Sequence, residues 1–233
     1  MRLSRSLVVA LDTQALDDAR ALADRVKESA AALKIGLELF VAEGPNAVRT
    51  IAREARRPIF LDLKLHDIPE TVERAVARAC ALGAALLTVH ACGGPAMLER
   101  AAARAAKEAT GLTVVAVTVL TSLDARDLAA TGATRAPLEQ ALLLARMAHG
   151  AGVSAFVCSP REVRALRDAL GADATLITPG VRPADAAADD QKRTDTPEGA
   201  IAAGANAVVV GRPIRDAADP RAAAERIARA IRS

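Results

Sequence analysis

The chain has neither tryptophan nor tyrosine, and phenylalanine occurs only three times in 233 residues. Proteins that bind single-stranded nucleic acid stack bases on aromatic side chains, and basic nucleic-acid sites cluster their charges. The net charge of +3 therefore does not indicate nucleic-acid binding, because the basic residues form no cluster either. The chain also lacks an uncharged apolar run of about 18 residues and an N-terminal cleavage signal. We expect a soluble, cytoplasmic protein.

Cysteine and histidine are too few and too scattered to predict a metal site. Cys80, Cys92 and Cys158 lie in apolar stretches without the spacing of metal ligands, which is typical of small core residues in a reducing compartment. His66 and His90 fall near the ends of predicted strands, but no third ligand stands at a suitable spacing. No G-x-S-x-G motif supports a serine nucleophile. We expect no metal.

Short aliphatic runs alternate eight times with longer segments rich in Ala, Arg and Glu. Near-continuous apolar character is typical of parallel strands covered by helices. Eight such units in a chain of this length predict a closed (β/α)8 barrel, a TIM barrel, as a single domain over residues 1–233. An open doubly wound sheet is the alternative, but no G-x-G-x-x-G follows any strand. The predicted strands cover residues 7–12, 32–38, 59–65, 86–91, 113–120, 155–160, 175–181 and 207–214.

The segments between the strands begin like helices. Two predicted capping boxes, Asp67 with Glu70 and Ser159 with Glu162, add side-chain acceptors for the first backbone N–H groups. Gly83 is placed to end the helix that follows Asp67. Proline also suits the first helical position, where its missing N–H has no cost. Seven prolines stand near predicted helix starts: Pro45, Pro69, Pro95, Pro137, Pro160, Pro197 and Pro220.

Two charges interrupt the apolar strand at 59–65, although lysine is scarce at 5 residues against 26 arginines. Side chains alternate along a strand, so Asp62 and Lys64 share one face, directed at the barrel axis. Asp12 and Lys34 belong to the first two strands and reach the same rim, where this architecture places its chemistry. We predict an alternating acid and base array there. The alternative is a buried ion-pair network that only fixes strand register.

A polar loop at residues 178–200 precedes the last strand. In this fold the loops after the seventh and eighth strands commonly bind phosphate. Gly211 permits close backbone approach to an anion, and Arg212 supplies a bidentate charge. Arg182 and Gln191 could complete the clamp if the loop folds over it. The other interpretation is a solvated surface loop.

Three further side chains have two interpretations each. Thr121 and Ser122 follow the fifth strand and place hydroxyls at the rim, either to contact a ligand amide or to cap a turn. Asp67 is either the N-cap of its helix or, because it is close to Lys64, part of the site.

Taken together, these motifs resemble the orotidine 5'-phosphate decarboxylase family. The resemblance spans nearly the whole chain with its blocks in the expected order, and D-x-K-x-x-D-I-P is the most specific of them. The matching blocks are "ALD" at 10–12, "KIG" at 34–36, "DLKLHDIPETV" at 62–72, "VHA" at 89–91, "LTS" at 120–122, "TPGVR" at 178–182, "DDQKR" at 189–193 and "VVVGRPI" at 208–214.

The resemblance implies decarboxylation of orotidine 5'-monophosphate to uridine 5'-monophosphate and CO2 in pyrimidine biosynthesis, with no metal or organic cofactor. It implies that Lys64 donates the proton to the ring carbon that loses CO2, and that Asp62 lies against the departing carboxylate. It further implies a homodimer, in which Asp67, Ile68 and Thr71 reach the active site of the partner subunit.

The same resemblance assigns the rest of the substrate. Asp12 and Lys34 hold ribose hydroxyls and orient the array, and Thr121, beside Ser122, contacts the pyrimidine. The resemblance implies that the phosphate is bound by Arg182, Gln191, Gly211 and Arg212. Two alternatives stay open: a Mg2+-dependent relative with the same D-x-K-x-x-D core, such as hexulose phosphate synthase or a ketogulonate-phosphate decarboxylase, and a phosphate-ligand sensor without catalysis.

Overall fold

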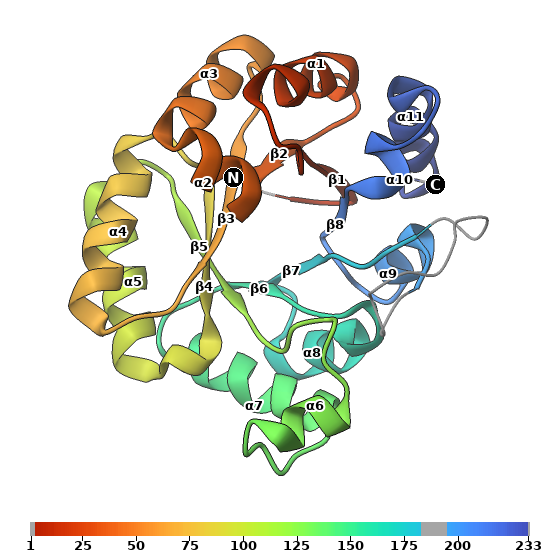
Figure 1. The fold of residues 1–233 in the computed structure, drawn as a ribbon. Coiled ribbons are helices and arrows are strands. Elements are labelled where there is room, and N and C mark those ends of the chain that lie inside the picture. Colours follow the sequence, from red (N-terminus) through yellow and green to blue (C-terminus); the bar gives the residue numbers. More distant parts are fainter. Residues whose placement is uncertain (1–2, 183–194, 233) are drawn as a thin grey trace.

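Eight parallel strands close into a barrel in the order of the chain (Figure 1). The computed structural model describes residues 3–182 and 195–232. The predicted (β/α)8 fold is confirmed, although several strands end up to four residues earlier than predicted, because apolar residues continue into the loops and helices of the rim. The strands are β1 Ser6–Ala10, β2 Ala32–Ile35, β3 Ile59–Leu65, β4 Leu86–His90, β5 Thr113–Val117, β6 Ala155–Val157, β7 Thr175–Thr178 and β8 Ala207–Val210.

Helices surround the barrel (Figure 1). All seven prolines predicted at helix starts occupy the first turn of a helix, as their fixed φ favours. None of the helices that the structure describes has the length and hydropathy needed to span a bilayer. The α-helices are α1 Leu16–Val26, α2 Leu37–Glu43, α3 Pro45–Ala55, α4 Pro69–Ala81, α5 Pro95–Glu108, α6 Ala125–Ala130, α7 Pro137–Gly150, α8 Val163–Leu170, α9 Pro197–Ala202, α10 Arg212–Arg215 and α11 Pro220–Ala230, with 3-10 turns η1 Ala91–Gly93 and η2 Pro160–Glu162.

One of the two predicted capping boxes is wrong. Ser159 and the residue three positions later form the expected box at η2. At α4, however, Pro69 takes the first helical position, so Ile68 is the N-cap and has no side-chain acceptor. Asp67 stands one residue too early and accepts a hydrogen bond from the Ile68 N–H at 2.6 Å instead. The end of α4 is as predicted, because Gly83 follows it with φ of 77°.

The apolar side chains form two layers, one inside the barrel and one between the strands and the helices. β3 contributes to both layers because its side chains alternate. Phe60 is buried inside the barrel together with Val8. Leu61, Leu63 and Leu65 point outward and pack in the layer beneath the helices. The opposite face of β3 is therefore left to the charged residues at the rim.

Arg167 of α8 joins two loops at the amino-terminal end of the barrel, the α8–β7 loop and the α9–β8 loop, a role that no sequence pattern indicated. Its guanidinium donates hydrogen bonds to the backbone carbonyls of Gly171, Ala174 and Gly204 at 2.7 to 3.3 Å. It also donates to Asn206 Oδ1 at 2.6 Å. The contacts to Ala174, Gly204 and Asn206 are partly buried, so removing the guanidinium leaves buried acceptors without a donor.

We expect Arg167→Ala to lower the free energy of unfolding by about 2 to 4 kcal/mol, since hydrogen bonds from a charged donor are lost together. Urea denaturation measures this change. Arg164→Ala, an exposed position on the same helix, is the matched control and should stay within about 0.5 kcal/mol of the unsubstituted protein. Equal denaturation midpoints for the two variants would show that Arg167 has no such role.

Candidate active site

Four charged side chains meet at the carboxyl ends of β1, β2 and β3. The Lys34 ammonium lies 2.9 Å from Asp12 Oδ1 and 3.4 Å from Asp62 Oδ2. The Lys64 ammonium lies 2.8 Å from Asp62 Oδ1. The structure therefore brings together the four residues that the sequence placed at this rim, in the alternating order Asp12, Lys34, Asp62 and Lys64. We call them the charged array.

Burial and charge oppose each other in the array, and charge prevails. Burial of Lys34 acts to lower its pKa, but Asp12 and Asp62 outweigh it and hold that pKa above its ordinary value. Burial of Asp62 acts to raise its pKa, but Lys34 and Lys64 hold that pKa below its ordinary value. Each inner group is stabilised in its charged form by its neighbours. The centre of the array is therefore ionised at neutral pH.

The backbone of β3 departs from regular geometry at Lys64. The register against β4 shifts between Leu61 and Leu65, and Lys64 has φ of 50°, a left-handed conformation that is uncommon for a lysine. Its N–H donates to Thr88 Oγ1 at 2.8 Å, and the Thr88 hydroxyl donates to Asp62 Oδ1 at 3.0 Å. Sequence reasoning missed Thr88, because "LLTVH" looks like an ordinary buried strand.

The position of Asp12 depends on two more residues, Gly36 and Arg215, to which sequence reasoning assigned no role. A methyl group on Gly36 would lie 3.0 Å from both Asp12 Oδ1 and Lys34 Nζ, so only glycine leaves the ion pair undisturbed. Gly36 stands two positions after Lys34, and strand alternation was the signal that could have found it. Arg215 donates to the Asp12 carbonyl at 2.7 Å, and no local pattern indicates that contact.

A cavity of about 320 Å3 opens over the array. Most of the residues predicted to bind a substrate line it, alongside the apolar side chains of Phe60, Val117 and Val157. The cavity thus combines charged groups with an apolar wall, as small-molecule sites do. The predicted residues that line it are Asp12, Lys34, Asp62, Lys64, Thr121, Ser122, Arg182, Gly211 and Arg212.

The remaining predicted residues are not in this cavity. Asp67, Ile68 and Thr71 are exposed at the start of α4, and Ile68 retains 65% of its accessible surface. They do not line the cavity of their own chain. Gln191 lies outside the described residues.

Two arginines contribute to the cavity from the last two units of the barrel. Arg212 begins α10, and Gly211 is the N-cap before it. A methyl group on Gly211 would lie 3.4 Å from Asp12 Oδ2, so this backbone adjoins the array. Arg182 follows an isolated bridge between Val181 and Asp195, and its N–H donates to the Asp195 carbonyl at 3.0 Å. Two guanidinium groups beside one cavity suit an anionic group on a ligand.

Potential metal ligands do not gather in the part of the chain that the structure describes. Within those ranges no three His, Cys, Asp or Glu side chains form a group that could hold an ion. His66 and His90 lie side by side with ring centroids 5.7 Å apart.

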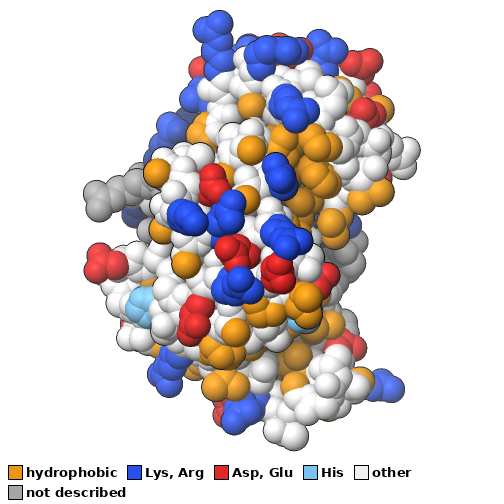
Figure 2. All heavy atoms as spheres, turned by 90° about the vertical axis from the view of Figure 1, so that its left-hand side faces the viewer, with side chains coloured by type: hydrophobic (Ala, Val, Ile, Leu, Met, Phe, Trp, Pro, Cys, Tyr) orange, Lys and Arg blue, Asp and Glu red, His pale blue; other side chains and the backbone are white. Residues whose placement is uncertain are grey.

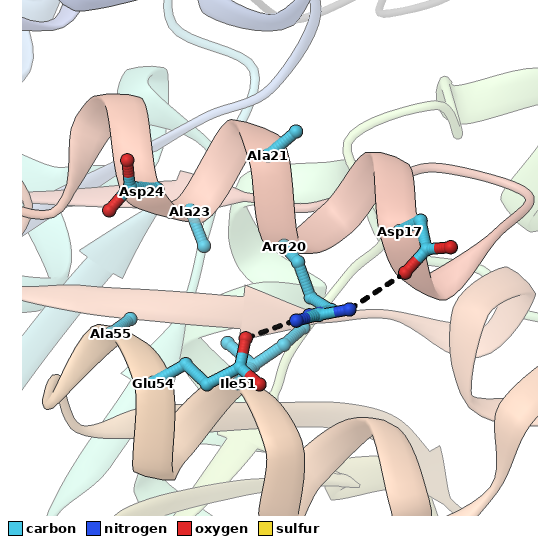
Figure 3. Close-up of a pocket in the computed structure, with 8 residues that line it drawn as sticks. All are labelled: Asp17, Arg20, Ala21, Ala23, Asp24, Ile51, Glu54 and Ala55. Atoms are coloured by element: carbon cyan, nitrogen blue, oxygen red, sulfur yellow. Dashed lines mark hydrogen bonds and ion pairs between the residues drawn. The ribbon is translucent and has the colours of Figure 1, made fainter.

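A second hollow, of about 360 Å3, lies between α1 and α3 (Figure 3). Arg20 extends into it and donates to Glu54 Oε2 at 2.7 Å and to Asp17 Oδ1 at 2.9 Å. These charges satisfy one another at the surface. The hollow is therefore a groove bridged by an ion-pair network, and it carries none of the residues predicted for chemistry.

A charged cavity at the carboxyl rim of a (β/α)8 barrel defines the class of the protein as a barrel enzyme. The chain belongs to the orotidine 5'-phosphate decarboxylase / HUMPS family, whose model matches residues 5–227. The family resemblance predicted from the sequence is confirmed, and with its relatives it identifies an enzyme of the lyase class.

Relatives in sequence and in structure agree. The chain is 54% identical to an orotidine 5'-phosphate decarboxylase from Anaeromyxobacter sp. (strain K), covering 98% of this chain and 99% of that one. It is 47% identical to the enzyme of that name from Rhodospirillum rubrum, covering 94% and 91%. The crystal structure of orotidine 5'-phosphate decarboxylase from Lactobacillus acidophilus superposes with a TM-score of 0.85 at 34% identity, covering 99% of this chain and 100% of that one.

Proposed function

We propose that the protein converts orotidine 5'-monophosphate to uridine 5'-monophosphate and CO2, as a step of pyrimidine nucleotide synthesis, with no metal or organic cofactor. The observation that carries the proposal is the contact between the Lys64 ammonium and the Asp62 carboxylate in a cavity that arginines also line. Family membership supplies the substrate.

The proposed chemistry follows from where the electrons go. Breaking the bond between the ring carbon and the carboxylate releases CO2 and leaves an electron pair on that carbon. An ammonium placed at the carbon stabilises the developing negative charge and then transfers a proton to it. In this proposal Lys64 is that donor, and it recovers its proton from solvent after the product leaves.

Asp62 has two roles in this proposal. Its carboxylate orients the Lys64 ammonium through their 2.8 Å contact, and its negative charge lies beside the carboxylate that the substrate loses. Lys34 and Asp12 bind the ribose hydroxyls and keep Asp62 in place through the 3.4 Å and 2.9 Å contacts of Lys34. The negative charge of Asp62 is thus held where it favours departure of CO2.

The remaining proposed contacts divide the cavity between the base and the phosphate. The hydroxyls of Thr121 and Ser122 are proposed to contact a pyrimidine amide, and the support is that both residues line the same cavity as Lys64. The phosphate is assigned to the arginine side chains and the Gly211 backbone, which suit an anion. These phosphate residues are Arg182, Gly211 and Arg212, with Gln191 proposed from the sequence alone.

We also propose a homodimer in which Asp67, Ile68 and Thr71 complete the site of the partner subunit. All three are exposed. Large apolar side chains are also exposed on α2, which follows β2 at the same rim of the barrel, with Leu37 at 51% and Val41 at 80% accessible. Figure 2, viewed from the side that carries α4 and α5, shows apolar side chains gathered beside intermixed acidic and basic ones. Such a surface favours a protein interface.

We expect the purified protein to deplete the ultraviolet absorbance of orotidine 5'-monophosphate at an undiminished rate in excess EDTA, since the donors in the array are protein groups. The family also contains sugar-phosphate enzymes, for which a divalent ion would be needed, and the same assay separates them. Activity abolished by EDTA and restored by Mg2+ would contradict the cofactor-independent proposal. Tight binding of the nucleotide without turnover would favour the alternative function, a phosphate-ligand sensor without catalysis.

A further inference from the structure

Thr88 occupies the place where β3 and β4 lose their regular register. It stands in the middle of β4 with no accessible surface. Along β3 the chain advances from Leu61 to Leu65 while β4 advances only from Leu87 to Val89. The two extra residues of β3 bulge away from the ladder, and Thr88 is the residue of β4 that lies opposite them.

The Thr88 hydroxyl makes two hydrogen bonds that belong to the charged array. Its oxygen accepts the Lys64 N–H at 2.8 Å, and its proton is donated to Asp62 Oδ1 at 3.0 Å. The same Asp62 oxygen contacts the Lys64 ammonium at 2.8 Å. One buried hydroxyl thus contacts both the backbone of the proposed proton donor and the carboxylate that orients its ammonium.

This arrangement answers a structural problem. A bulge removes a backbone N–H from the ladder, and a buried N–H without an acceptor is costly. A lysine in a left-handed conformation persists only where its surroundings determine it. The Thr88 oxygen supplies that acceptor at the one residue of β3 whose φ is positive.

We propose that Thr88 is a positioning residue, whose hydroxyl fixes the Lys64 backbone and the Asp62 carboxylate in the one arrangement that aims the ammonium at the substrate. The catalytic consequence rests on the proposed function. The hydroxyl does not touch the substrate in this proposal, because Thr88 is fully buried and is not among the residues that line the cavity.

Thr88→Val keeps the shape of the side chain and removes the hydroxyl, whereas Thr88→Ser keeps the hydroxyl. We expect kcat of the valine variant to fall about ten- to a hundredfold, the effect of a misplaced catalytic group. Its Kd for uridine 5'-monophosphate should change by less than about threefold, because the binding contacts remain. The serine variant should recover most of the lost kcat. Thr113→Val, at the opposite end of the barrel in β5, controls for the substitution itself.

A pH profile separates positioning from simple destabilisation. The groups facing Asp62 are Lys34 on β2, Lys64 on β3, and Thr88 and His90 on β4. Burial acts to raise the pKa of Asp62, but the two lysines and the Thr88 hydrogen bond together outweigh it and hold that pKa below its ordinary value, so losing the Thr88 hydrogen bond raises it. The acid limb of kcat should therefore move to higher pH in Thr88→Val and stay in place in Thr88→Ser.

Each outcome bears on the proposal separately from the proposed function. A valine variant whose kcat lies within twofold of the unsubstituted enzyme, or a serine variant as impaired as valine, would overturn it. If the valine variant fails to fold, Thr88→Ala is measured in the same way. If the unsubstituted protein does not consume orotidine 5'-monophosphate, the proposed function fails, and hydrogen exchange of the Lys64 amide then decides: faster exchange in valine than in serine supports the positioning role, and equal exchange refutes it.

Discussion

Lys64→Ala is expected to lower kcat for orotidine 5'-monophosphate by at least about 10⁴-fold, while the Kd of uridine 5'-monophosphate rises by less than about tenfold. In the proposed mechanism the substitution removes both the proton donor and the cation that stabilises the carbanion, and no other group replaces Lys64 in either role. Binding is largely retained because the proposed ribose and phosphate contacts belong to other residues. Steady-state kinetics and titration calorimetry measure the two quantities.

Lys107→Ala is the matched control, since Lys107 is exposed on α5, away from the cavity. It should leave both constants unchanged. A large rise in Kd with kcat preserved would assign Lys64 to binding alone and remove it as donor. In the proposed mechanism Lys64 does not act by itself, because the barrier reduction required is about 20 kcal/mol or more, in the upper range for enzymes. The neighbours in the array must contribute.

Asp62→Asn is expected to lower kcat by about 10³-fold and the free energy of unfolding by about 3 to 5 kcal/mol. The amide preserves size and removes the charge that lies between Lys34 and Lys64. The Asp62 side chain is only 13% exposed. Once its charge is removed, solvent therefore screens the repulsion between the Lys34 and Lys64 ammonium groups only weakly. Chemical denaturation measures the stability change.

The acid side of the stability profile gives a second measurement of the same substitution. The folded protein holds the pKa of Asp62 below its ordinary value of 3.8. Its stabilisation is therefore complete above that value and is lost as the pH falls through the lower, folded value. Asp62→Asn should lack this part of the acid loss. Asp24→Asn, at an exposed pair with Lys27, is the control and should leave stability nearly unchanged, because solvent screens an exposed pair. Equal effects at the two positions would contradict a buried array.

The barrel and the array were predictable because they depend on local patterns. Apolar runs and first-turn prolines mark the strands and helices, and alternation along β3 places Asp62 and Lys64 on one face. Charged side chains on the inner face of such a strand are accommodated at the carboxyl-terminal mouth of the barrel, because the interior is packed with apolar side chains. The sequence therefore predicted which four side chains meet and that acid and base alternate, and the structure adds the distances between them.

What the sequence missed depends on contacts between distant segments. The bulge at Lys64 is set by the pairing of β3 with β4, so Thr88 gives no local signal. Arg167 joins loops that are separated along the chain, and its acceptors are backbone carbonyls, which every residue has. The capping box at Asp67 failed for a local reason, because Pro69 takes the first helical position and shifts the N-cap by one residue.

The most direct test of the central claim is single-turnover decarboxylation, with enzyme in excess over orotidine 5'-monophosphate so that all nucleotide is bound. The account predicts that Lys64→Ala binds the nucleotide but releases CO2 at least about 10⁴-fold more slowly than the unsubstituted protein. Release of CO2 by the variant within tenfold of the unsubstituted rate would contradict the claim that the charged array, with Lys64 as donor, carries the chemistry.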